Sequence, residues 1–178
     1  MFEQFGHLSQ HMALHIVLMN FLVPLGIGAA RGTFDFPIWR SWPLATAVQL
    51  LLLWGWHAPP VLAAAMHAPA LMILMHVSLV LAAAWFWAAV FSVPQEGGWR
   101  AIFALLISGK LFCLLGILLV FAPRQVYAGM THTALDIEAA LADQHLAGLI
   151  MVVACPLSYV LAGVVIAARW FMALEARA

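Results

Sequence analysis

The sequence predicts an all-α, polytopic membrane helix bundle. Of its 178 residues, 66% are hydrophobic and 8% are charged, and the mean hydropathy is +1.05. A soluble domain is about 45–50% apolar and about 25% charged. The apolar residues form long runs rather than the short alternating pattern of β-strands. We therefore expect one transmembrane domain over residues 1–178, in contact with the lipid bilayer.

Five apolar runs are each long enough to cross a bilayer, which takes about 20 residues. The second run contains Pro59 and Pro60, which lack a backbone donor, so its helix should kink or stop just after His57. Thr133 and Asp136 are spaced as a helix N-cap pair, which predicts a short surface helix ending near residue 144. The five expected spans cover residues 8–30, 43–65, 70–93, 99–122 and 145–170.

Basic residues predict the orientation of these spans, because Lys and Arg concentrate in cytoplasmic loops. With five helices, the N-terminus and the second and fourth loops share one side, and that side carries Arg124 alone. The opposite side carries Arg31, Arg40, Arg100, Arg169 and Arg177. The N-terminus should therefore lie outside the cytoplasm and the C-terminus inside.

Histidines are the main functional signal. His7, His11 and His15 recur every four residues and so share one face of the first helix. In the predicted topology all eight histidines fall in the outer half of the bundle, the others being His57, His67, His76, His132 and His145. Ionisable groups inside a membrane are rare and face the protein interior, and imidazole is the commonest side-chain metal ligand. We expect His11, His15, His57 and His76 to bind a metal, and His7, His67 and His132 to lie at the surface.

Two further residues could complete this site. Met72 lies one turn before His76, and its thioether favours Cu(I), although ordinary core packing is the alternative. His145 follows Asp143, which either caps their helix or holds the imidazole in its ligating tautomer. Copper, zinc and iron all accept imidazole. Histidines on two facing helices, for instance His15 and His76, would instead ligate heme.

Other chemistry has little support. Lys110 lies near mid-membrane, where a charge is a functional candidate unless it is paired or reaches the surface. Cys113 and Cys155 lie in apolar runs and suit packing, with a deeper thiol site for Cu(I) as the alternative. The sequence contains no evident Ser/His/Asp set, phosphate loop or paired carboxylates. The formal net charge is zero, so no nucleic-acid partner is indicated.

Several motifs in order resemble one family. They are His11-Met-Ala-Leu-His15, Trp56-His57-x-Pro59, His76-Val-Ser-Leu, Leu119-Val-Phe-Ala-Pro123 and Asp143-Gln-His-Leu-Ala-Gly148. The chain resembles the CtaG family of cytochrome c oxidase assembly factors, the multi-helix type associated with caa3 oxidases. The resemblance implies copper handling at the outer face of a bacterial inner membrane, with oxidase subunits and a periplasmic copper donor as partners. The family's histidines map onto His11, His15, His57 and His76.

The chain also departs from that family pattern. Met72 replaces a second histidine, His145 stands where the family tends to have Gln, and Val152 stands where it tends to have Trp. The chain is also short for the family. Either His145 replaces a lost ligand, or this member has moved toward another function.

The leading interpretation is a membrane copper-binding factor that supports assembly of a heme-copper oxidase, and not an enzyme. One rival is a membrane redox protein that binds heme or copper through the same histidines. The other is a structural subunit of a respiratory complex.

Overall fold

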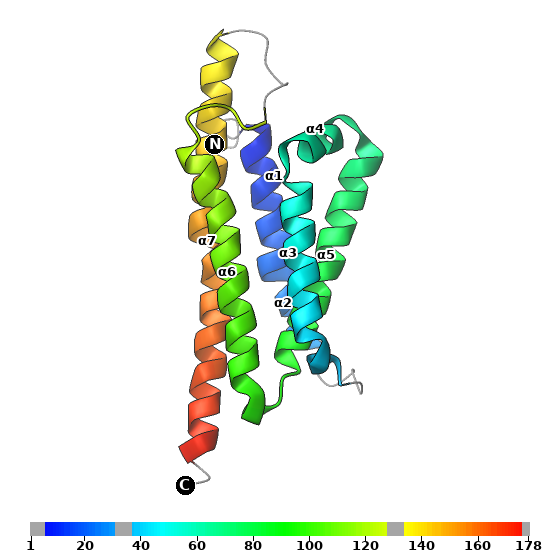
Figure 1. Cartoon of the computed structure of the whole chain (residues 1–178), viewed down its shortest axis with the longest axis vertical. Coiled ribbons are helices and arrows are strands. Elements are labelled where there is room, and N and C mark those ends of the chain that lie inside the picture. The colour runs from blue at the N-terminus through cyan, green and yellow to red at the C-terminus, as the bar shows by residue number, and fades with distance from the viewer. Residues whose placement is uncertain (1–5, 31–36, 128–133, 176–178) are drawn as a thin grey trace.

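The structure is a computed structural model that describes residues 6–30, 37–127 and 134–175, and only the backbone of residues 134–136. Every regular element in these ranges is a helix (Figure 1). Four helices are long and apolar enough to cross a membrane, and a bent pair of helices supplies a fifth span if it counts as one. The predicted all-α, multi-pass bundle is therefore confirmed.

The first span changes its helical pitch below its histidines. It consists of α1 (His7–Ile16), a π-helical segment (Val17–Leu22) and α2 (Val23–Ala29). Together these match the expected span of residues 8–30. The Trp87 indole N–H donates to the Met19 carbonyl at 3.1 Å, within the π-helical segment. Such segments are rare and often occur at functional sites.

The second span breaks where the prolines predict. After a 3-10 turn (Ile38–Ser41), α3 (Trp42–Trp56) ends and α4 (Pro59–His67) begins, and the two helices are bent by 72°. In Figure 1, α4 lies across one end of the bundle instead of continuing α3. His57 thus occupies the turn between them.

The third and fourth spans lie close to the expected limits, whereas the fifth does not. The third span is α5 (Pro69–Phe91), the fourth is α6 (Gly98–Phe121) and the fifth is α7 (Ala134–Glu175), with a 3-10 turn (Gln95–Gly97) between α5 and α6. The prediction of a separate surface helix before residue 145 is wrong, because α7 runs on without interruption. No Gly or Pro occurs between Ala134 and His145, so nothing in the sequence ends the helix there. Thr133, its expected N-cap, lies outside the described residues.

Close packing of α6 on α7 rests on two glycines. A Cβ atom at Gly148 would lie 2.7 Å from the Gly116 carbonyl oxygen, and one at Gly116 would lie 2.9 Å from the Gly148 carbonyl oxygen. Small residues of this kind let membrane helices approach closely. The α6–α7 pair lies side by side in Figure 1, and α1 packs against α7.

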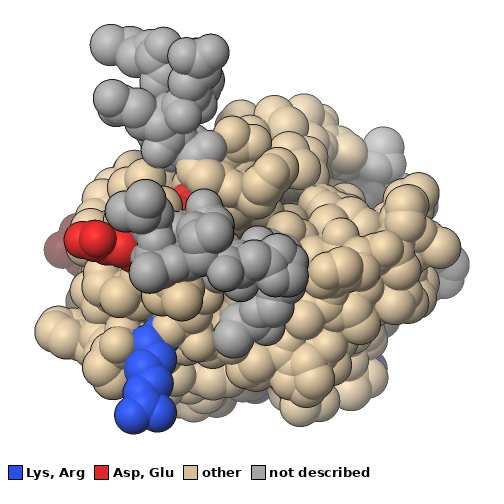
Figure 2. Space-filling view, turned by 90° about the horizontal axis from the view of Figure 1, so that it is seen from above, with Lys and Arg blue, Asp and Glu red and all other residues tan. Residues whose placement is uncertain are grey.

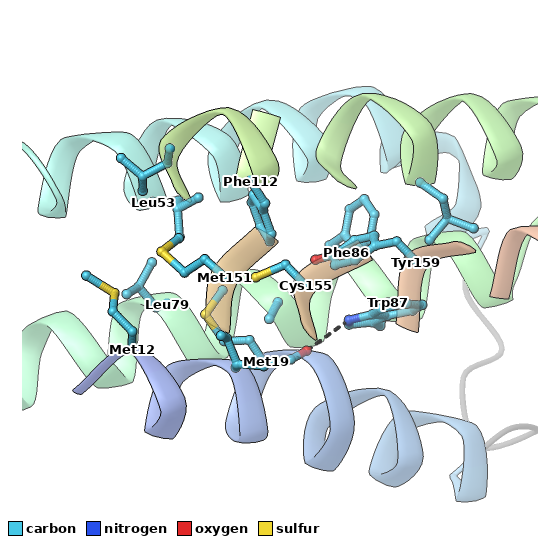
Figure 3. Packing of buried hydrophobic residues seen from close by; sticks show 14 of the residues in the cluster. Met12, Met19, Leu53, Leu79, Phe86, Trp87, Phe112, Met151, Cys155 and Tyr159 are labelled. Carbon is cyan, nitrogen blue, oxygen red and sulfur yellow. Dashed lines mark hydrogen bonds between the residues drawn. The ribbon is translucent and has the colours of Figure 1, made fainter. Parts of the chain in front are cut away.

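An aromatic cluster fills the middle of the bundle. Phe86 and Trp87 from α5 meet Phe112 from α6 and Tyr159 from α7 (Figure 3). The Gln49 side-chain amide donates to the Tyr159 hydroxyl at 2.7 Å. This core joins the helices below the histidine-bearing end of the bundle.

The two ends of the bundle differ in charge. The end that carries the start of α1 shows few charged side chains in Figure 2. Of the Arg residues placed at the helix ends in the described ranges, Arg124 lies at this end, and Arg40, Arg100 and Arg169 lie at the other. Near that second end the Arg100 guanidinium stacks over the rings of Trp39 and Trp99, at 5.4 and 5.1 Å. Arg–Trp groups of this kind are typical of a membrane interface.

Candidate metal centre

Four imidazoles from three spans meet inside the end of the bundle that has fewer Arg residues. His11 and His15 lie on α1, His57 follows α3, and His76 lies on α5. The ring centroid of His15 is 4.3 Å from that of His11, 4.6 Å from that of His76 and 5.7 Å from that of His57. His15 is thus the centre of the group, which we call the imidazole cluster.

The imidazole cluster presents open ring nitrogens to its own interior. The Nδ1 atoms of His57 and His76 each lie 2.7 Å from a backbone carbonyl one turn earlier, that of Leu53 and of Met72 respectively. A carbonyl only accepts, so Nδ1 carries the proton and Nε2 presents its lone pair. The Nε2 atoms of all four histidines, and Nδ1 of His15, are buried and have no hydrogen-bond partner among the residues that the structure describes.

This arrangement fits a metal ion. One ring nitrogen from each of His11, His15 and His57 lies within 4.8 Å of the other two, and all three residues are buried. A buried polar atom without a partner costs about 1–3 kcal/mol, whereas lone pairs converging on one point are what a cation requires. Orientation of the ligand through its other nitrogen is the usual arrangement at metal sites.

Asp143 of α7 fixes the helix that carries His11 and His15. Its carboxylate accepts from the backbone N–H groups of Leu8 and Ser9, at 2.9 and 3.2 Å, and from the Ser9 hydroxyl. These groups form the first turn of α1, where helix N–H groups are unpaired and a negative charge is favourable. A Cβ atom at Gly6 would collide with this carboxylate, at 2.2 Å from its carbon. Asp143 therefore caps α1. The sequence predicted instead that it caps its own helix or orients the His145 ring, so this role was not expected.

His57 is held by the chain around it. The Tyr127 hydroxyl donates to the His57 carbonyl oxygen at 3.0 Å. Burial raises the pKa of Tyr127 to about 12, so this hydroxyl remains a donor at physiological pH. The Trp56 indole N–H donates to the Ser78 hydroxyl at 2.9 Å and ties the end of α3 to α5, which carries His76.

Met72 and His145, the two residues expected to complete the metal site, have different surroundings. Met72 is half-buried on α5, and its backbone carbonyl orients the His76 ring. His145 is half-buried on α7, and its Nε2 lies 3.4 Å from the Ala122 carbonyl oxygen. Within the described residues, neither His76 nor His145 belongs to the group of nitrogens that lie within 4.8 Å of one another. His76 nevertheless lies beside His11 and His15 through its ring contacts.

The remaining candidates lie elsewhere. His7 is exposed, His67 is exposed with Nδ1 donating to the Ala63 carbonyl at 2.7 Å, and His132 lies outside the described residues. Lys110 is exposed on α6, in a largely apolar groove between α6 and α7 that also exposes part of Cys113.

Sequence reasoning missed two residues beside the imidazole cluster. Asn20 and Met151 are buried and line a small cavity together with His15 and His57. Asn20 could have been noticed as an amide inside an apolar run. Met151 precedes Cys155 by four residues, so the two share a face of α7.

Comparison with known proteins decides the family. The family model described as cytochrome c oxidase caa3 assembly factor (Caa3_CtaG) matches residues 3–173 of the chain. The chain belongs to the CtaG family. The resemblance found in the sequence motifs is thereby confirmed, and this CtaG-family chain is a multi-pass membrane protein. Searches of curated proteins and of solved structures returned no significant match.

Proposed function

We propose that this CtaG-family chain binds copper in the imidazole cluster and supplies it during assembly of a caa3-type cytochrome c oxidase. The observation that carries the proposal is the convergence of four imidazoles, three of them buried, whose buried Nε2 atoms have no partner among the described residues. His11, His15 and His57 are the proposed primary ligands, and His76 is the fourth.

Met72 and His145 have secondary places in this proposal. The Met72 carbonyl holds His76 in the tautomer that presents Nε2. The Met72 thioether is available to Cu(I) if the Met72 side chain turns. His145 lies on α7 beside the C-terminal end of α6, and it is not among the nitrogens of His11, His15 and His57 that lie close together. It joins the site only if this part of α7 moves. We therefore expect substitution of His145 to affect copper binding least.

The choice of an ion over heme rests on space. The rings of His15 and His76 have centroids only 4.6 Å apart, and the cavity beside His15 measures about 20 Å³. Axial heme ligands must stand on opposite faces of a flat macrocycle, and this separation leaves no room for one. Of the ions that accept imidazole, copper is the one that a heme-copper oxidase needs in addition to iron.

The proposed location follows from charge. The imidazole cluster lies at the end of the bundle that has fewer Arg residues, which the positive-inside rule assigns to the non-cytoplasmic side. In a bacterial inner membrane this side is periplasmic, where a copper donor and the oxidase subunits are accessible. The N-terminus would then be periplasmic and the C-terminus cytoplasmic.

The test is the copper content of the caa3-type oxidase purified from host cells that carry variants of this chain. We expect the His15→Ala/His57→Ala variant to yield oxidase with at least tenfold less copper, with its heme retained. The matched control is His67→Ala, which removes an exposed imidazole outside the cluster. Fully copper-loaded oxidase, with the double variant present in the membrane at normal abundance, would overturn the proposal.

A further inference from the structure

A small cavity adjoins the imidazole cluster on the side of the bundle core. Its volume is about 20 Å³, and a cavity of roughly 10–15 Å³ already holds one water-sized particle. The residues that matter in its lining are Met12, Met19, Met151, Cys155, His15 and His57. It therefore has room for a single small particle and is lined by both sulfur and imidazole.

The sulfur atoms come from two helices that face each other. Met19 lies in the π-helical segment, and Met151 and Cys155 lie one turn apart on α7. All three are 3% exposed, and their side chains point toward one another in Figure 3. Methionine commonly fills gaps in a core, but these side chains surround open space instead of filling it.

Polar atoms in the same lining point to a ligand. Asn20 is 2% exposed and lines the cavity, and its side-chain amide faces the Cys155 thiol at hydrogen-bonding reach. The Nε2 atoms of His15 and His57, which line the same cavity, have no hydrogen-bond partner within the described ranges. An apolar core would not place two such imidazoles at one cavity, because each unpaired polar atom lowers stability.

We propose that this cavity is a second copper site, which takes Cu(I) through the sulfur atoms of Met19, Met151 and Cys155. Thioether and thiolate ligands select Cu(I), whereas imidazole also accepts Cu(II). The inference deepens the proposed function and rests on it for the identity of the ion. The cavity adjoins both His15 and His57, so an ion could move between the two sites without entering lipid.

Charge balance supports a thiolate in this site. Cu(I) held only by thioethers would leave a net positive charge in a medium of low dielectric constant, which is costly. Binding therefore forms a copper–sulfur bond at Cys155 and releases the thiol proton to solvent, and the site becomes neutral. Copper arrives as Cu(I), so no electron is transferred.

The test is anaerobic titration of the detergent-purified full chain with Cu(I) against a chromophoric Cu(I) chelator, with copper X-ray absorption as a second readout. The test variant is Met19→Leu/Met151→Leu/Cys155→Ser. Its matched control, Met66→Leu/Met75→Leu/Cys113→Ser, makes the same exchanges at positions that do not line the cavity. Met and Leu are similar in volume, so both variants should fold.

We expect the wild-type protein and the control to show copper–sulfur scattering and equal Cu(I) affinity. In the test variant, copper–sulfur scattering should fall, with only the Met12 thioether left at the cavity, and at least one Cu(I) equivalent should bind tenfold more weakly or be lost. Unchanged Cu(I) binding in the test variant, or no sulfur scattering in the wild type, would overturn the second site.

Separate probes distinguish this inference from the proposed function. Cu(II) added in air reports the imidazole cluster, and Ag(I), which prefers sulfur, reports the cavity. Loss of Ag(I) binding in the sulfur variant, in a protein that binds no Cu(II), would support the cavity site and contradict the imidazole site. Cu(II) binding to a protein that takes up no Ag(I) would overturn the cavity site alone.

Discussion

Two groups of buried or half-buried polar side chains lie at the same end of the bundle and differ in one respect. The side chains of Asp143 and Gln144 on α7 form hydrogen bonds with backbone groups of other segments. His15 has two buried ring nitrogens, and neither has a hydrogen-bond partner in the part of the chain that the structure describes. The first group connects helices through hydrogen bonds and so has a structural role, and the second has the unpaired atoms expected of a ligand site.

The difference shows that burial alone does not identify function in a membrane bundle. Both groups contain polar residues inside an apolar chain, and the sequence pointed to one member of each, Asp143 and His15. Satisfied groups stabilise the fold, and unsatisfied groups lower its stability unless something binds them. The two groups should therefore respond to apolar substitution with opposite signs.

The largest stability effect should come from Gln144→Leu. The Gln144 amide donates to the carbonyls of Leu119 and Arg124, and its oxygen accepts from the Val126 N–H at 2.7 Å. Substitution leaves these backbone groups without their partner and should lower the free energy of unfolding by about 3 kcal/mol. Unfolding in mixed detergent micelles measures this change, and Gln95→Leu, at an exposed position, is the control. A decrease in the free energy of unfolding no greater than in the control would show that the Gln144 hydrogen bonds do not stabilise the fold.

Asp143→Ala should have the next largest effect. It removes the cap from the first turn of α1, and loss of such a cap costs about 1–2 kcal/mol. Because α1 carries His11 and His15, Cu(II) affinity should fall as well. The control is Glu138→Ala, which removes an exposed carboxylate from the same helix. If the two variants unfold alike and bind Cu(II) alike, Asp143 does not position the imidazole cluster.

His15→Leu should have the smallest effect on stability, and in the opposite direction. In metal-free protein it replaces a buried imidazole without hydrogen bonds by an apolar side chain, so stability should be unchanged or rise by up to about 1 kcal/mol. Cu(II) affinity should fall at least tenfold. The same unfolding assay and a Cu(II) titration measure both quantities. Destabilisation by more than about 2 kcal/mol would place His15 with the structural group.

The sequence predicted the bundle well because each apolar run is long and Pro59 marks the break after α3. It failed at the expected end of a short helix near residue 144, because α7 begins at Ala134 and runs on to Glu175. The residues around position 144 are an unbroken series of helix formers, so the chain has no local reason to leave the helix there.

The candidate site was predictable only in part. The four-residue spacing of His11 and His15 indicates a shared face, and loop order brings His57 and His76 to the same end. Spacing could not show that Asp143 caps a helix more than 130 residues away in sequence. It also could not show the cavity beside Met151, because that contact depends on how α1 packs against α7.

The most direct test of the central claim is copper X-ray absorption on full-length protein loaded with Cu(II) in air and freed of weakly bound metal. Imidazole ligands produce a distinctive multiple-scattering pattern. The account predicts about one Cu(II) per chain with three or four imidazole ligands, and loss of that copper in a His15→Ala/His76→Ala variant that still folds. Failure of the wild-type protein to retain Cu(II), or retention without imidazole scattering, would contradict it.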